Sequence, residues 1–256
     1  MAERRAYGEG VYRRAFLLMA QEGRVVADME DDFHRFRVVV EHDGARVKRV
    51  GAETIRVPWT ECAGAAAKLR ALEGMPLSRR QSAAGRHADP RVNCTHLFDV
   101  ATLAIAHAAA GRARRRYDVE IPDRRDGRTQ ARLARDGAPL LAWQVEGAKV
   151  LAPEPYTGLD LGSIGFLLWT EKRLDPELAE AALLLRRACF ISMGRLRDLD
   201  AAADASAYVG LAPGSCHTFT PGVAERALRV RGATLEFSEH PERLLADVAE
   251  SERRSA

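Results

Sequence analysis

Carboxylate, thiol and imidazole side chains recur in three stretches of the first hundred residues. They are Asp31, Asp32, His34, Cys62, Cys94 and His96. These three groups are the ligands that divalent zinc takes in proteins. The stretches fall where a predicted strand turns, where a strand gives way to a helix, and where a second helix begins. Such positions can meet at one end of a small sheet, so we expect the groups to share one site.

One interpretation of this group is a metal site. Cys62 and Cys94 would be ligands, together with Asp32 and either His34 or His96. Cys62 lies at a predicted strand-to-helix junction and Cys94 at the start of a predicted helix. Because a helix N-terminus favours an anion, we expect a lowered pKa for each thiol. The protein would then be a non-catalytic zinc or iron–sulfur carrier, or a hydrolase that uses a zinc-bound water. The plainer alternative is that the cysteines are buried packing residues and the histidines make ordinary core hydrogen bonds.

A second interpretation uses the same stretches without a metal. Asp32 in a partly dry cleft would act as a general base, and His96, with His34 beside it, would transfer a proton near neutral pH. We then expect a lyase or hydratase that breaks or forms a carbon–carbon or carbon–oxygen bond in an apolar aromatic or acyl substrate. No cofactor is required in this case, and zinc is the alternative. The neighbouring Glu30 and Asp31 are expected to form a solvated turn.

Four further side chains are expected to bind the substrate. They are Trp59, Tyr156, Arg187 and His217. Aromatic rings can wall an apolar pocket, and a planar guanidinium can hold a carboxylate. Each has a plainer alternative, because aromatic residues are usually core and an arginine in the last turns of a helix is expected from the helix dipole.

The composition and the missing motifs exclude several classes of protein. The chain has 256 residues with a formal net charge of +3, which is too even a balance for a nucleic-acid or membrane-surface role. No apolar run is long enough to span a membrane, and 4 cysteines do not make a disulfide scaffold in a chain of this length. Dinucleotide-binding glycine patterns, Walker loops, Gly-x-Ser-x-Gly elbows and His-Glu-x-x-His are absent. We expect a cytoplasmic protein with a small-molecule substrate and no nucleic-acid or membrane partner, and a homodimer formed through an apolar face is left open.

The elements that must position these residues follow an α+β pattern. Strands are predicted at 12–20, 23–29, 35–41, 46–50, 53–57, 117–121, 129–133, 140–145, 149–151 and 235–237, and helices at 63–72, 93–111, 177–193 and 221–227. We predict a surface loop at 78–90, an irregular loop at 153–165, a turn at 214–217 and a frayed end at 250–256. Two portions follow. Residues 1–112 form an antiparallel β-meander with two helices, and residues 113–256 form a second β-rich portion with a long helix, packed on the first.

Over nearly its whole length the sequence resembles the bacterial family known as domain of unknown function 2889. The pieces that carry the resemblance are Tyr12-Arg13-Arg14, Asp32-x-His34-x-Phe36, Arg56-Val-Pro-Trp-x-x-Cys62, Cys94-Thr-His-Leu97, and Leu185-Arg-Arg-Ala-Cys-Phe190 with Gly194-Arg195. The order of all five pieces gives the resemblance its specificity. It implies a connection with the bacterial degradation of aromatic or isoprenoid compounds.

Residues 30–110 are more distantly similar to the U-type iron–sulfur scaffold proteins. The shared features are a hairpin, a cysteine before a helix, a Gly-x-x-Leu step at 74–77 and the run Val92-Asn-Cys-Thr-His-Leu. The resemblance implies cluster ligands at Cys62 and Cys94 with a neighbouring carboxylate at Asp32. Glu30 and Asn93 replace a cysteine and a histidine of that motif, so the resemblance implies a shared fold with changed chemistry.

Overall fold

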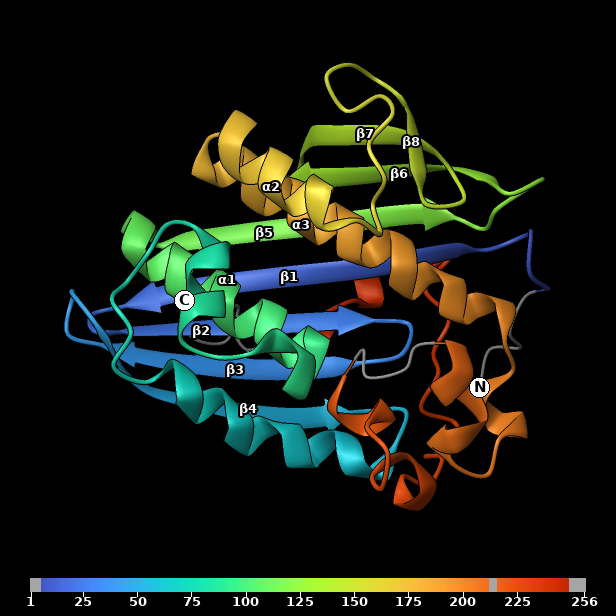
Figure 1. Cartoon of the computed structure of the whole chain (residues 1–256), viewed down its shortest axis with the longest axis horizontal. Helices are drawn as coiled ribbons and strands as arrows, with labels where there is room; N and C mark the ends of the chain where they lie inside the picture. The colour runs from blue at the N-terminus through green and yellow to red at the C-terminus, as the bar shows by residue number, and fades with distance from the viewer. Residues whose placement is uncertain (1–5, 212–215, 249–256) are drawn as a thin grey trace. The chain divides into compact units, whose positions relative to one another are not determined.

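The strands of the computed structural model belong to one antiparallel sheet. The model describes residues 6–211 and 216–248. The sheet has 8 strands in the order β4-β3-β2-β1-β5-β6-β7-β8 (Figure 1). The strands are β1 (Val11–Gln21), β2 (Arg24–Asp31), β3 (Arg35–His42), β4 (Val47–Arg56), β5 (Arg114–Pro122), β6 (Arg128–Arg135), β7 (Ala138–Glu146) and β8 (Lys149–Ala152). With the helices, this sheet confirms the predicted α+β class.

Three α helices and a series of short 3₁₀ helices accompany the sheet. The α helices are α1 (Thr95–Ala110), α2 (Ile164–Arg173) and α3 (Pro176–Ile191). The 3₁₀ helices are η1 (Thr60–Leu72), η2 (Gln81–Arg86), η3 (Pro90–Val92), η4 (Ser192–Leu196), η5 (Leu199–Ala201), η6 (Ala205–Leu211), η7 (His217–Phe219), η8 (Ala224–Arg226) and η9 (Pro241–Arg243). Within residues 6–211 and 216–248, none of the helices combines the length and the apolar character that crossing a membrane requires.

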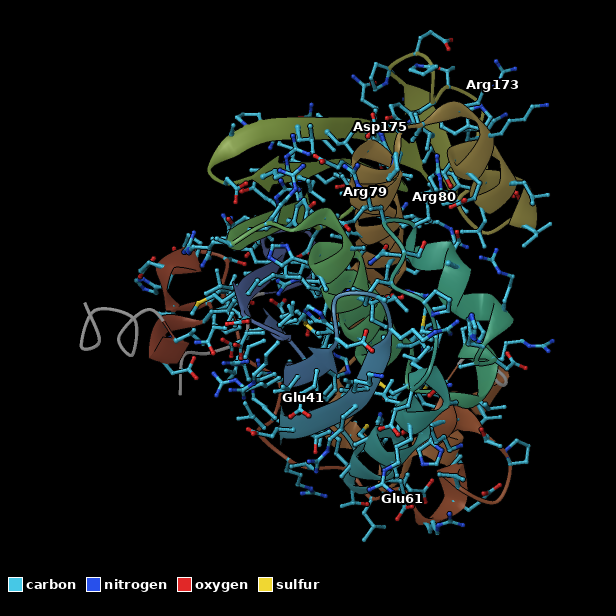
Figure 2. All side chains as sticks on the ribbon, turned by 90° about the vertical axis from the view of Figure 1, so that its left-hand side faces the viewer. Glu41, Glu61, Arg79, Arg80, Arg173 and Asp175 are labelled. Atoms are coloured by element: carbon cyan, nitrogen blue, oxygen red, sulfur yellow. The ribbon has the colours of Figure 1, made fainter. Side chains whose placement is uncertain are left out.

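Turn and capping residues set the ends of these elements. The hairpins β5–β6 and β6–β7 turn at Asp126-Gly127 and Asp136-Gly137, where all four residues have positive φ, as two-residue hairpin turns require. Helix α1 ends at Gly111, which is left-handed with φ 64°. Helix α3 begins after Asp175, labelled in Figure 2, whose carboxylate accepts the N–H groups of residues 177 and 178. These turns and helix ends confirm those predicted from the sequence.

The chain forms two compact units. The first unit comprises Met1–Phe16, Arg116–Arg197 and Leu235–Ala256, and the second comprises Leu17–Arg115 and Asp198–Thr234. In the first unit, α3 packs against α2, β6 and β7. In the second unit, α1 covers β2 and β3, and η1 runs along β4 (Figure 1). The second unit therefore contains the β2–β3 turn, η1 and the start of α1, which carry the predicted catalytic and metal-ligating residues.

Several predicted segments differ from the structure. Residues 53–57 are not a separate strand, because β4 continues its pairing with β3 from Val47 to Arg56. The predicted surface loop at 78–90 contains the short helix η2, in which two alanines are buried. Two apolar residues among polar neighbours are too few to indicate a helix from the sequence. Helix α2 begins at Ile164, at the end of the predicted irregular loop at 153–165, and was not predicted, because glycines and prolines crowd the sequence before it. It begins after Ser163, whose hydroxyl accepts the N–H of Phe166.

The C-terminal part also departs from expectation. Residues 235–237 form no strand in the described part of the chain. Instead, the Ser238 hydroxyl accepts a hydrogen bond from the backbone N–H of Val11 at 2.7 Å. The predicted helix at 221–227 is reduced to the single turn η8, and α3 stops at Ile191, before Gly194. Residues 214–215 and 250–256, predicted to be a turn and a frayed end, lie outside the described residues.

Candidate functional site

Asp31, His34 and His96 form a compact group of potential metal ligands. One ligand atom from each lies within 4.8 Å of the others, and no other such group of three occurs among residues 6–211 and 216–248. All three residues are buried, with exposed fractions of 0%, 8% and 8%. Removing three polar side chains from water is unfavourable unless they interact with one another or with a ligand. The group is therefore the strongest candidate for a functional site in the second unit.

The β2–β3 turn positions the first two members of this group. The Asp31 carboxylate Oδ1 accepts the backbone N–H groups of Phe33 at 2.8 Å and His34 at 2.7 Å. The backbone N–H of Asp31 in turn donates to the carbonyl of His34 at 2.9 Å. This is an Asx-type turn, in which an aspartate side chain replaces a backbone acceptor. It places the His34 Nδ1 only 3.1 Å from the Asp31 Oδ1.

The start of α1 brings the third member against the turn. Helix α1 packs on β2 and β3, and its second residue is His96. The His96 ring stacks on the His34 ring with 3.9 Å between centroids and 29° between planes. The ring of Phe36, itself fully buried, lies 5.5 Å from the His34 ring and 6.3 Å from the His96 ring. These apolar neighbours strengthen electrostatic interactions within the group, because they lower the local dielectric constant.

The spacing of the group suits a single divalent cation. Nitrogen and oxygen ligands bind zinc at about 2.0–2.2 Å, so two of them lie about 3 Å apart at a right angle and about 4.2 Å apart on opposite sides. The 3.1 Å between His34 Nδ1 and Asp31 Oδ1 is in that range, and all three ligand atoms lie within 4.8 Å of one another. Two histidines and one carboxylate fit zinc and also form the donor set of non-haem iron sites.

Asp31 rather than Asp32 supplies the carboxylate of this group. Both residues are fully buried, and Glu30 is 9% exposed, so the expected solvated turn at Glu30 and Asp31 is wrong. The turn is buried because the Asp31 carboxylate satisfies backbone N–H groups that would otherwise need water. Asp32 contributes its backbone carbonyl, which accepts a hydrogen bond from Arg56 at 3.0 Å. The sequence signal for Asp31 is its place at the start of a tight turn, where an aspartate typically bonds the backbone two residues on.

Neither of the two N-terminal cysteines is part of this three-residue group. The Cys94 Sγ lies 3.9 Å from the His96 Nδ1, and the Cys62 Sγ lies 3.4 Å from the Thr218 hydroxyl. Burial raises the pKa of Cys62 to about 11 and raises that of Cys94 further. The nearby thiols raise the pKa of Cys94 as well. The predicted lowering is therefore wrong, because burial outweighs the effect of a helix N-terminus on both thiols.

The four predicted substrate-binding residues divide between the units. Trp59 and His217 belong to the second unit, whereas Tyr156 and Arg187 belong to the first. The buried Trp59 ring packs near Tyr208 in an apolar cluster, with 5.8 Å between the centroids. Tyr156 packs against two tryptophan rings at 5.2 Å and 5.4 Å, and Arg187 is half-buried on α3. The two aromatic residues thus have the surroundings of core residues.

His217 and the residue after it contact the segments that carry Cys94 and Cys62. The His217 backbone N–H donates to the carbonyl of Asn93 at 3.0 Å, and the next residue, Thr218, contacts Cys62. Its Nδ1 is buried without a hydrogen-bond partner in the described structure. Burial lowers the pKa of His217, and the positive charge of Lys68 lowers it further. The ring is therefore neutral at pH 7.

Part of the chain is similar to a known protein family. Residues 18–110 match the model of a family described as a protein of unknown function, DUF2889. This DUF2889 region runs from β1 to the end of α1 and contains Asp31, His34 and His96. The similar motifs at 12–14 and 185–195 lie outside the match. No curated protein matches the chain.

Proposed function

We propose that the protein binds a divalent transition-metal ion through Asp31, His34 and His96 and uses it in the chemistry of a small molecule. The observation that carries the proposal is the buried group itself, whose three ligand atoms lie within 4.8 Å of one another. Structural zinc sites usually have four protein ligands, whereas catalytic sites have three and keep a position for water or substrate. A three-ligand set therefore favours an enzyme over a carrier.

The reaction class that fits best is addition or removal of water. A bound divalent ion lowers the pKa of its water and polarises a carbonyl oxygen, which are the requirements of a hydratase, a lyase or a hydrolase. The apolar residues around the group favour a largely apolar substrate, such as an aromatic or acyl compound. This keeps the reaction class predicted from sequence and replaces Asp32 with Asp31.

A metal titration tests the proposal. Protein stripped with a chelator should bind one equivalent of Co²⁺ or Zn²⁺, measured by calorimetry and by the visible spectrum of Co²⁺. Asp31→Asn and His96→Gln should each weaken binding by at least about 100-fold, because each removes a ligand. Asparagine keeps an oxygen that can accept the N–H groups of Phe33 and His34, so the turn should survive.

The matched control is His107→Gln. His107 is another buried histidine of α1, and it is not part of the group. This variant should bind the metal as wild type does. Wild-type protein that binds neither ion, or His96→Gln protein that binds as tightly as wild type, would show that the proposal is wrong.

A second candidate function follows from the contact between Asp31 and His34. A carboxylate 3.1 Å from an imidazole Nδ1 orients the ring and leaves its other nitrogen to act as a general base. Turnover of α,β-unsaturated acyl or cinnamoyl compounds in the presence of excess chelator, lost in His34→Gln, would favour this dyad. Turnover that requires added metal would favour the metal centre.

A further inference from the structure

We infer that Arg56 is a positioning residue for the Asp31–His34–His96 centre, an inference that rests on the proposed function. Arg56 is the last residue of β4, and its side chain is 14% exposed. Its guanidinium faces the β2–β3 turn, which carries two of the three proposed ligands. The hydrogen bonds from Nη1 reach the carbonyls of Asp32 at 3.0 Å and Ala233 at 2.7 Å, and those from Nη2 reach the carbonyls of Asp31 at 2.6 Å and His34 at 3.2 Å and the carboxylate of Glu30 at 3.1 Å.

These bonds hold the backbone on both sides of the proposed ligands. The carbonyls of residues 31, 32 and 34 all accept from one planar group, so the turn cannot shift without breaking several bonds at once. The bond to Ala233 ties the same turn to the segment that follows η8. Within the turn, the Asp31 carboxylate holds two N–H groups, and Arg56 holds the carbonyls. The donors and acceptors of the turn are thus fixed from two directions.

An arginine suits these five acceptors, which the four N–H groups of Nη1 and Nη2 reach with at least one N–H shared between two acceptors. Its guanidinium is a rigid fork with five N–H donors, whereas a lysine ammonium is a single point with three. Lysine would keep the positive charge but could reach only part of the five acceptors. The Glu30 carboxylate, 11% exposed, neutralises the guanidinium and so reduces its repulsion of a nearby cation. Arg56 therefore acts through geometry, and a change that preserves the charge should still disturb the centre.

The effect should appear in the affinity and the geometry of the metal site. Residues that orient metal ligands typically contribute about 10–100-fold in affinity. Arg56→Lys should therefore weaken Co²⁺ binding by about 10–100-fold and change the visible spectrum of bound Co²⁺, which reports ligand geometry. Loss of global stability alone would leave the spectrum of the bound fraction unchanged.

The matched control is Arg37→Lys. Arg37 lies on β3, and its guanidinium pairs with the Asp28 carboxylate at 3.0 Å instead of with the turn. This variant should bind Co²⁺ within about 2-fold of wild type, because only a charge pair away from the ligands changes. If Arg56→Lys does not fold, Glu30→Gln should weaken binding by about 3-fold, since it weakens one charge-assisted bond to the guanidinium.

The outcomes separate this inference from the proposed function. Wild-type protein that binds no Co²⁺ would overturn both. Wild-type binding together with an Arg56→Lys protein of unchanged affinity and spectrum would overturn only the role of Arg56. If Arg56→Lys does not fold, an unchanged Co²⁺ affinity of Glu30→Gln would likewise overturn the role of Arg56.

Discussion

At the scale of single residues, burial outweighs sequence position in deciding chemistry. Cys62 lies in the first turn of η1 and Cys94 caps α1, where a thiolate would be favoured, yet burial of both thiols favours the neutral form. Burial also raises the pKa of Cys189, on α3, to about 12. None of these three thiols is therefore a reactive nucleophile at neutral pH. The proposed carrier with cysteine ligands stays a prediction, and binding would have to displace the thiol protons.

The pKa of Cys62 gives a direct prediction. We consider a variant in which serine replaces Cys94, Cys189 and Cys216. The rate of Cys62 alkylation by iodoacetamide should keep rising with pH until about 11 in the folded protein. At pH 8 the folded protein should have about 100-fold less thiolate than the unfolded chain, because each pKa unit is a factor of ten.

Alkylation of the same variant in urea is the control. There the rate should level off near the ordinary thiol pKa of about 9. A folded-state profile that levels off below pH 9 would contradict the raised pKa.

At the scale of elements, short side-chain bonds to the backbone decide where helices begin. The Asp175 carboxylate accepts two N–H groups at the start of α3, at 2.9 Å and 3.1 Å. Ser163 accepts one at the start of α2, at the longer distance of 3.3 Å. Asp175 also places a negative charge at the positive end of the longer helix. The cap of α3 should therefore contribute more to stability than the cap of α2.

Alanine substitutions measure this difference. Asp175→Ala should lower the free energy of unfolding by about 1–2 kcal/mol, and Ser163→Ala by about 0.5 kcal/mol, in urea titrations. The matched pair controls for the loss of a side chain at a helix start. Equal losses of unfolding free energy, or a larger loss in Ser163→Ala, would show that the geometry of the cap does not determine how much it stabilises the protein.

At the scale of the whole molecule, a buried ion network joins distant parts of the first unit. The Arg195 guanidinium donates to the Asp123 carboxylate at 2.7 Å and to the Glu236 carboxylate at 3.0 Å. The Asp123 carboxylate also accepts the N–H groups of Gly8 at 3.2 Å and Gly10 at 3.0 Å. A side chain at Gly10 would not fit, because a Cβ there would lie 1.9 Å from the Arg195 Nη2. The network thus connects four chain segments that are remote in sequence.

Removing Arg195 should destabilise the protein strongly. Arg195→Met removes the partner of the buried Asp123 carboxylate and of the partly buried Glu236 carboxylate, and should cost about 3–5 kcal/mol of unfolding free energy. Arg128→Met is the control, because it breaks an exposed pair with Glu146 and should cost less than about 1 kcal/mol. Urea titrations at pH 7 compare the two variants. If both variants lose the same amount of unfolding free energy, burial does not make the Arg195 network more stabilising than an exposed ion pair.

The cost of Arg195→Met should also depend on pH. Burial alone would raise the pKa of Glu236, but its bonds to Ser238 and Arg195 outweigh burial and lower the pKa below the ordinary 4.5. A carboxylate with a lowered folded-state pKa stabilises the protein above its unfolded pKa and loses that contribution as the pH falls. The difference between Arg195→Met and wild type should therefore shrink below about pH 4, as the Glu236 carboxylate protonates.

Local patterns in the sequence were enough to predict the α+β class, most strands and the limits of the main helices. Alternation of apolar residues, Asp-Gly turns and capping residues act over a few positions, so they can be read without the fold. The same reasoning placed His34 and His96 near one another, at a strand turn and a helix start. It could not place α2, whose start is obscured by a run of glycines and prolines.

The tertiary structure alone decided between Asp31 and Asp32 and revealed Arg56. Asp31 and Asp32 are of the same type and adjacent in the sequence, so the sequence does not distinguish them. The folded turn determines which of the two carboxylates lies beside the imidazoles. Arg56 contacts residues 30–34 and 233, which no sequence window contains together. The thiols are likewise buried by segments that are distant in the sequence. For example, Thr218 contacts the Cys62 thiol. Side-chain direction and burial are properties of the assembled core, and for that reason the pattern of residue types alone does not determine them.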